Sequence, residues 1–124
     1  MSRDKGKRGE REAARWLRDT FGLEAERNAQ QYKGGGAANA DVLCPALPCV
    51  HFEVKRNEAM QVGTDLLEKA MRQAEKDAGD RMPLVLWRRN RMRWQATMRV
   101  HGICATFDAE QLVEAVLMTD EGRL

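Results

Sequence analysis

The stretch that decides the fold is Val50-His51-Phe52-Glu53-Val54-Lys55-Arg56, which Asp41 precedes. Its apolar and polar residues alternate, and this pattern predicts a β-strand because successive strand side chains point to opposite faces. The apolar members would face a core. The polar members would share the other face and bring acid and base together: His51, Glu53 and Lys55.

A second strand is predicted over residues 40–44, joined to the first by the turn-forming insert Pro45-Ala46-Leu47-Pro48. Pairing of the two strands would bring Asp41 alongside Glu53 in one of the registers open to them. Two neighbouring carboxylates suit a hard divalent cation such as Mg²⁺. Lys55 would stabilise negative charge beside them, so the expected substrate is a phosphodiester.

Length predicts one domain over residues 1–124, with the first five or so residues as a basic arm. The alternation of predicted helices and strands along the chain makes this an α/β domain. The sequence contains no apolar run long enough to cross a bilayer, and its start lacks the apolar segment of a secretory signal. Three cysteines argue against a disulfide framework. We expect free thiols packed as small hydrophobes (Cys44, Cys49 and Cys104) and a cytoplasmic location.

The net charge is only +2, but the charges are segregated. Residues 81–107 contain six arginines and no acid. This pattern predicts basic surfaces that hold a polyanion, with a solvated and evenly charged surface as the alternative.

The first helix is predicted over residues 6–21, ending at Gly22. Glu10 lies on its apolar stripe, where an acid is costly unless it is paired or helps to hold a metal. The alternative is an exposed acid in the first turn, favoured by the helix dipole.

A short strand is predicted over residues 24–28, followed by a loop at Gly34-Gly35-Gly36 that is either a mobile loop near the active site or a plain connector. A helix over residues 65–78 would start at Thr64 and place Gln73 at the border of its apolar face. Residues 83–88 and 92–98 predict a hairpin whose tryptophans, Trp87 and Trp94, either contact nucleic acid or pack in the core. A last helix is expected over residues 109–118.

Several of these stretches together resemble the PD-(D/E)XK nuclease superfamily, and more narrowly the archaeal-type Holliday junction resolvases and their small phage-encoded relatives. The resemblance is carried by Lys5-Gly6-Lys7-Arg8-Gly9-Glu10-Arg11-Glu12, by the glycine loop, by Asn39-Ala40-Asp41-Val42 and by Phe52-Glu53-Val54-Lys55. It implies a restriction-endonuclease-like core, in which helices flank a mixed central β-sheet in the order αβββαβ.

The resemblance also implies roles for individual residues. Asp41, Glu53 and the backbone carbonyl of Val54 would bind Mg²⁺, or Mn²⁺ in its place, with Glu10 acting through a water. Lys55 would assist the nucleophile, and Gln73 is a further candidate that could instead be a boundary polar residue. The partners implied are DNA, as four-way junctions, and a second copy of the chain. The DNA phosphates would be bound by Lys5, Lys7, Arg8, Arg11, Lys33, Arg56, Arg88, Arg89 and Arg91.

Two positions depart from the superfamily pattern. Ala40 stands where the superfamily name places proline, and the glycine loop lacks the hydroxyl residue common in resolvases. Two alternatives to a resolvase therefore remain. The first is another structure-specific, nicking or restriction-like nuclease of this fold. The second is a catalytically silent DNA-binding protein of recombination or packaging.

Overall fold

The stretch Val50–Arg56 forms β3, an inner strand of a six-stranded sheet ordered β1-β2-β3-β4-β5-β6. The computed structural model describes residues 2–29 and 39–122, with side chains for 6–29 and 39–119. The elements follow the chain as α1 (Ser2–Phe21), β1 (Glu26–Arg27), β2 (Val42–Leu43), β3, α2 (Asp65–Ala78), β4 (Met82–Arg88), β5 (Gln95–Val100), β6 (Ile103–Asp108) and α3 (Ala109–Gly122). The first six reproduce the predicted order αβββαβ.

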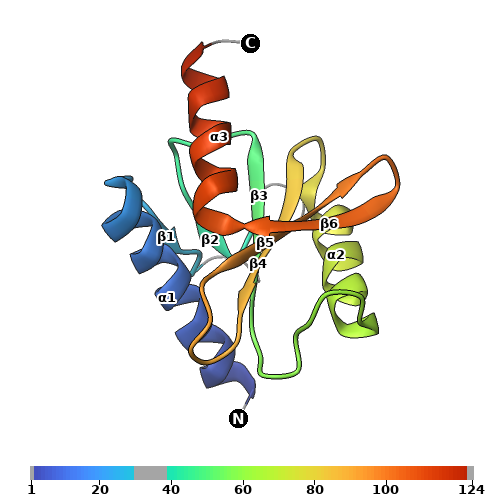
Figure 1. The fold of residues 1–124 in the computed structure, drawn as a ribbon. Coiled ribbons are helices and arrows are strands. Elements are labelled where there is room, and N and C mark those ends of the chain that lie inside the picture. The colour runs from blue at the N-terminus through green and yellow to red at the C-terminus, as the bar shows by residue number, and fades with distance from the viewer. Residues whose placement is uncertain (1, 30–38, 123–124) are drawn as a thin grey trace.

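Helices cover both faces of the sheet, with α1 and α2 on opposite sides (Figure 1). The apolar residues of β3 pack with Leu17 of α1 and Val113 of α3 in one core cluster. Val85 and Trp87 of β4 pack with α2 in a second cluster. Strands β3 and β4 are parallel and the other neighbours are antiparallel, which makes this the mixed, restriction-endonuclease-like sheet expected from the sequence.

Several element boundaries differ from the prediction, among them that of β5, which lies at Gln95–Val100 where residues 92–98 were expected. Helix α1 begins at Ser2, so the residues expected to form a basic arm are its first turn. The two strands before β3 are shorter than predicted. The chain also forms a hairpin, β5–β6, that the sequence did not reveal. His101 and Gly102 connect it with φ of 52° and 81°, the left-handed conformation that two-residue hairpin turns require.

The structure resolves the alternatives for the two tryptophans and tests the expectation for the three cysteines. Trp87 and Trp94 are buried, so they belong to the core, and the Trp87 indole N–H donates to Thr97 Oγ1 over 2.9 Å. All three cysteines are free, as predicted. Cys49 is nevertheless exposed, because it follows Pro48 in the turn, and the expectation of a packed thiol is wrong there.

In the part of the chain that the structure describes, no helix combines the length and apolar character that a membrane span needs.

Candidate active site

The pairing of β2 with β3 brings Asp41, just before β2, close enough to Glu53 for the Glu53 charge to act on it. Val42 pairs with Phe52, and the Asp41 N–H donates to the Phe52 carbonyl over 2.9 Å. The Val54 N–H in turn donates to Asp41 Oδ2 over 2.8 Å and fixes that carboxylate against β3. Of the registers open to these two strands, the structure thus has the one that joins the two predicted acids.

Buried Asn28, which the sequence analysis did not single out, holds the backbone around Asp41. Its N–H donates to the Asp41 carbonyl over 3.0 Å, and its Nδ2 donates to the Ala40 carbonyl over 2.8 Å. These bonds continue the β1–β2 pairing by one residue and fix the direction in which the Asp41 side chain leaves the sheet.

The two acids repel each other, and this repulsion shows in the pKa of Asp41. Burial, followed by the negative charge of Glu53, raises that pKa from 3.8 to about 8. The charge of Glu10 also raises it, whereas the Val54 N–H and the Lys55 ammonium lower it. At neutral pH Asp41 is therefore protonated unless additional positive charge reaches it.

Glu53 lies between two basic side chains of its own strand. Lys55 Nζ is 3.8 Å from Glu53 Oε2, and His51 Nε2 is 3.9 Å from Glu53 Oε1. The Lys55 side chain is 43% exposed, whereas that of Glu53 is 8% exposed. The ammonium is therefore the accessible member of the group, which is where a charge that meets a substrate should lie.

Glu10 is buried on the inward face of α1, as predicted, and it lies beyond the first turn of the helix. Its Oε1 is 3.1 Å from Nε of Arg27, a partner that the sequence did not indicate. Gly9 permits the close approach of α1, because a Cβ there would lie 2.7 Å from Cβ of Arg56. The Glu10 charge lies close enough to raise the pKa of Asp41.

The Gln73 amide donates to Asp77 Oδ2 over 2.7 Å, a partner within its own helix. Gln73 also lines a cavity of about 290 Å³ that opens beside Lys55. Lys69, another residue that sequence reasoning missed, lines the same cavity. The side of the site that faces α2 thus carries two ammonium groups and an amide.

The carboxylates fit a divalent cation that is only partly coordinated by protein. Among the described residues, no group of three or more His, Cys, Asp or Glu side chains converges on one point. Asp41 and Glu53 together supply a pair of oxygen ligands, and a bound cation would supply the positive charge that lets Asp41 ionise. Mg²⁺ is commonly held in this way, by one or two carboxylates with water and substrate phosphate completing its shell.

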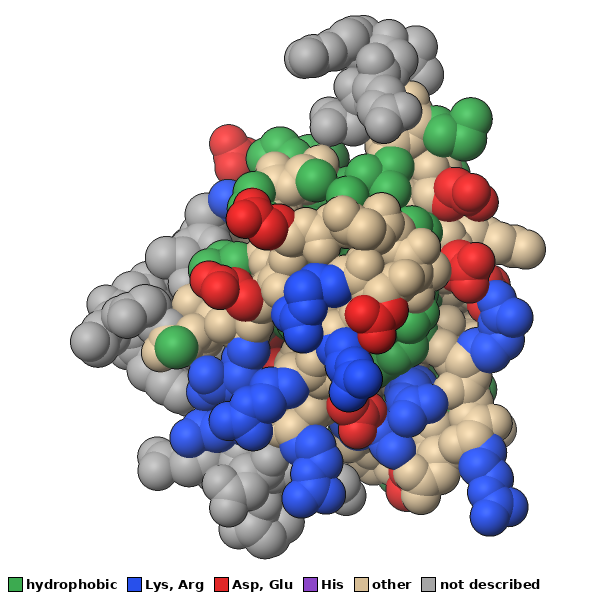
Figure 2. Space-filling view, turned by 90° about the vertical axis from the view of Figure 1, so that its left-hand side faces the viewer, with side chains coloured by type: hydrophobic (Ala, Val, Ile, Leu, Met, Phe, Trp, Pro, Cys, Tyr) green, Lys and Arg blue, Asp and Glu red, His purple; other side chains and the backbone are tan. Residues whose placement is uncertain are grey.

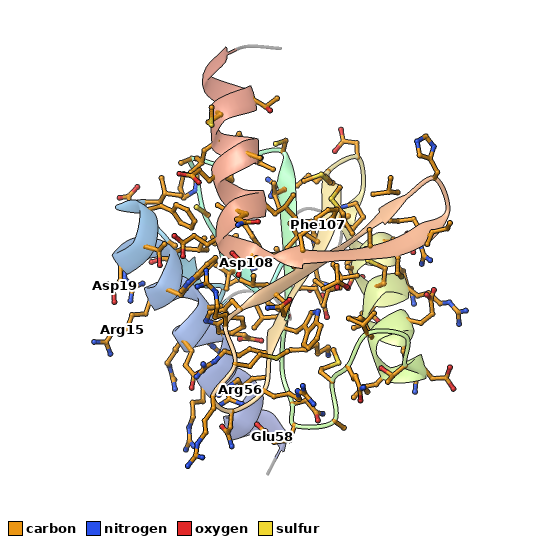
Figure 3. All side chains as sticks on the ribbon, in the orientation of Figure 1. Arg15, Asp19, Arg56, Glu58, Phe107 and Asp108 are labelled. Carbon is orange, nitrogen blue, oxygen red and sulfur yellow. The ribbon has the colours of Figure 1, made fainter. Side chains whose placement is uncertain are left out.

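The predicted DNA-binding residues differ in how far their side chains are exposed and in whether they form ion pairs within the protein. Arg8, Arg11 and Arg91 are exposed, whereas Lys7 and Arg89 are half-buried. Arg56 pairs with Glu12 over 3.1 Å and with Glu58 over 2.8 Å, and the latter pair can be followed in Figure 3. Arg88 lies over the Trp94 ring and 3.6 Å from Glu12. Lys33, the Lys5 side chain and the loop at Gly34-Gly35-Gly36 lie outside the described residues.

The run of arginines in residues 81–107 does not form one basic surface. Arg93 pairs with Asp108, and Arg99 pairs with Glu68 and Glu75, so acids from other elements neutralise part of the run. Lys and Arg side chains instead gather over the lower part of the face that carries α1, with a few acids among them (Figure 2).

The element order and the mixed six-stranded sheet flanked by helices define a restriction-endonuclease-like fold. Residues 1–120 match the family described as "Phage putative PDDEXK endonuclease". The chain belongs to this phage endonuclease family and with it to the PD-(D/E)XK nuclease superfamily. No curated protein and no solved structure matches the chain.

Proposed function

We propose that this protein is a metal-dependent endodeoxyribonuclease that hydrolyses phosphodiester bonds in branched DNA, with four-way Holliday junctions as its preferred substrate. The observation that carries the proposal is the proximity of Asp41 and Glu53 at β3, with Lys55 Nζ 3.8 Å from Glu53 Oε2. Membership of an endonuclease family supports the reaction. The resemblance of residues 5–12 to resolvases supports the substrate.

Each site residue has a distinct task in this proposal. Asp41, Glu53 and the Val54 carbonyl would hold Mg²⁺, for which Mn²⁺ can substitute. When bound, such a cation acts as a Lewis acid and makes water a stronger nucleophile. Lys55 places a positive charge where the phosphate gains negative charge during attack. Glu10, held by Arg27, orients water at the side of the site that faces α1.

The basic residues around α1 would bind the sugar-phosphate backbone of the DNA. Arg8 and Arg11 are exposed on this helix, and Arg91 is exposed in the turn after β4. Contacts of this kind give affinity without sequence preference, as expected of an enzyme that recognises DNA shape. We place this activity in the cytoplasm of a bacterial or archaeal cell, or of a phage-infected host.

A junction-cutting enzyme needs two active sites, and we propose that a two-fold homodimer supplies them. Edge strand β6 supports this proposal, because Ile103 and Phe107 are 69% and 41% exposed and no charged residue lies between them. An uncharged apolar edge of this kind favours pairing with another strand. Ile103→Lys should convert the dimer to a monomer in sedimentation equilibrium, and a wild-type monomer would refute the assembly.

The proposal is tested by incubating the protein with a labelled four-way DNA junction and with a linear duplex of matching sequence. Each reaction is run with Mg²⁺, with Mn²⁺ and with EDTA, and an RNA duplex is included. The site is checked with Asp41→Asn. Glu68→Gln is the matched control, since it neutralises a carboxylate on α2 that has its own arginine partner.

Paired nicks in the junction alone, dependent on the cation and lost in Asp41→Asn, are the expected result. Equal cutting of junction and duplex would replace the resolvase with a nicking or restriction-like nuclease. Binding without cutting under either cation would contradict the enzymatic proposal and leave a DNA-binding protein.

A further inference from the structure

His51 is a buried polar residue that no role described above uses. Its side chain is 0% exposed. Neither ring nitrogen has a hydrogen-bond partner among the residues that the structure describes. A buried polar group left without a partner costs about 1–3 kcal/mol, so its presence in a core calls for a reason.

The position of His51 relative to the acids supplies that reason. It precedes Glu53 by two residues on β3 and therefore shares its face of the sheet. Its Nε2 is 3.9 Å from Glu53 Oε1, whereas Lys55 Nζ is 3.8 Å from Oε2 of the same carboxylate. One carboxylate oxygen thus faces the buried imidazole, and the other faces the more exposed ammonium.

We propose that His51 is a positioning residue that donates an Nε2–H hydrogen bond to Glu53 Oε1 when the site binds a divalent cation. The bond would hold the carboxylate so that Oε2 is directed toward the cation and Lys55. The 3.9 Å gap closes by about 1 Å through rotation of the terminal Glu53 torsion, which is broad and soft.

The proposal rests on the proposed cation-dependent function, and it follows a general property of metal sites. Carboxylates that bind metal are commonly held by an outer hydrogen bond, and its removal typically lowers metal affinity or activity about 10–100-fold. A histidine that only fills space would show no such effect. The question is therefore whether the atom at the Nε2 position matters for cation binding.

Three variants at this position separate the two roles. His51→Gln retains an amide N–H near the Nε2 position, His51→Asn has its polar atoms only near the Nδ1 position, and His51→Leu has none. The affinity for Mn²⁺ is measured by electron paramagnetic resonance of the free ion, with no DNA present. Folding of each variant is checked by circular dichroism and by its Tm in EDTA.

We expect His51→Gln to bind Mn²⁺ within about 3-fold of wild type, and His51→Asn and His51→Leu to bind about 10–100-fold more weakly. If His51→Leu does not fold, the Gln and Asn variants decide the question by themselves. Equal affinity in the Gln and Asn variants would overturn the positioning role. Wild-type protein that binds no Mn²⁺ would overturn the proposed function and this inference together.

Discussion

Two groups of carboxylates in this protein, one beside β3 and one on α2, have pKa values shifted in opposite directions. Asp41 and Glu53 lie close together beside β3, and burial and mutual repulsion raise the pKa of Asp41 to about 8. Glu68 and Glu75 of α2 share Arg99 of β5, with N···O distances of 2.9 Å in both pairs. Hydrogen bonds from Arg99 and then from the Cys104 thiol lower the pKa of Glu68 to about 2.

The difference distinguishes acids that stabilise the fold through an ion pair from acids that are suited to bind a cation. In the group around Arg99 the negative charges are balanced within the protein, because each acid has a close cationic partner. The arginine also joins β5 to α2. The pair Asp41–Glu53 lacks such a close cationic partner. The basic atoms of His51 and Lys55 lie 3.8–3.9 Å from Glu53, and the pKa of Asp41 stays high. Strongly perturbed acids without a matching charge are typical of sites that bind a ligand or cation.

The largest expected effect is on DNA cleavage. Asp41→Asn and Lys55→Ala should each lower the rate by at least about 100-fold, because one removes a cation ligand and the other removes charge that stabilises the reacting phosphate. Glu68→Gln should leave the rate within about 3-fold of wild type, since its carboxylate already has a structural partner. The rates come from single-turnover cleavage of a labelled junction at fixed salt.

Affinity for the junction, measured in Ca²⁺ by gel shift, serves as the control for folding and binding. It should be nearly the same in all four proteins. Cleavage by Asp41→Asn or Lys55→Ala at the wild-type rate would show that the site lies elsewhere.

Stability should change in opposite directions when the two groups are neutralised. In EDTA at pH 8, Asp41→Asn should raise Tm by about 5 °C, because it removes a buried charge that the metal-free fold disfavours while its amide oxygen still accepts from Val54. Glu68→Gln should lower Tm, because Arg99 loses a charged partner. Differential scanning calorimetry of both variants beside wild type gives the comparison.

The pH dependence of these shifts follows from the signs of the two pKa changes. The pKa of Asp41 is raised, so its contribution to stability is present below pH 3.8 and is lost as pH rises toward 8. The gain in Asp41→Asn should therefore shrink in acid. The pKa of Glu68 is lowered, so its contribution is present above pH 4.5 and is lost as pH falls toward 2. Shifts of the same sign in both variants at pH 8 would contradict the comparison.

The smallest effect is expected at the basic face of α1. Arg11→Ala should weaken DNA binding a few-fold and reduce the slope of log affinity against log salt by about one, because an exposed arginine contributes one phosphate contact. Arg72→Ala, which removes an exposed arginine from α2, is the matched control and should leave the slope unchanged. Fluorescence anisotropy across a salt series measures both, and equal slopes would place the DNA on another face.

Local patterns were enough to predict the centre of this fold. The alternation in Val50–Arg56 gave β3 and the shared face of His51, Glu53 and Lys55, and the apolar stripe of α1 gave the buried position of Glu10. These features depend on strand and helix periodicity, which is visible in a single stretch of sequence.

Other features depend on contacts between distant segments, and the sequence alone could not give them. Arg99 joins acids that lie 24 and 31 residues away, which is why the run of arginines was interpreted as a basic surface. The Glu10–Arg27 pair and the Asn28 bonds that hold Asp41 also require the pairing of β1, β2 and α1. The hairpin β5–β6 escaped prediction because His101, a non-glycine residue, adopts positive φ in its turn.

The most direct test of Asp41 and Glu53 as a cation site is to count the protons that the protein releases when it binds a cation. Titration of Mn²⁺ into wild type at pH 7, by calorimetry in two buffers of different ionisation enthalpy, should show release of close to one proton per ion, because Asp41 must ionise to become a ligand. Release should vanish in Asp41→Asn and persist in Glu68→Gln. Tight binding without proton release in wild type, or equal release from Asp41→Asn, would contradict the assignment of Asp41 and Glu53 as the cation site.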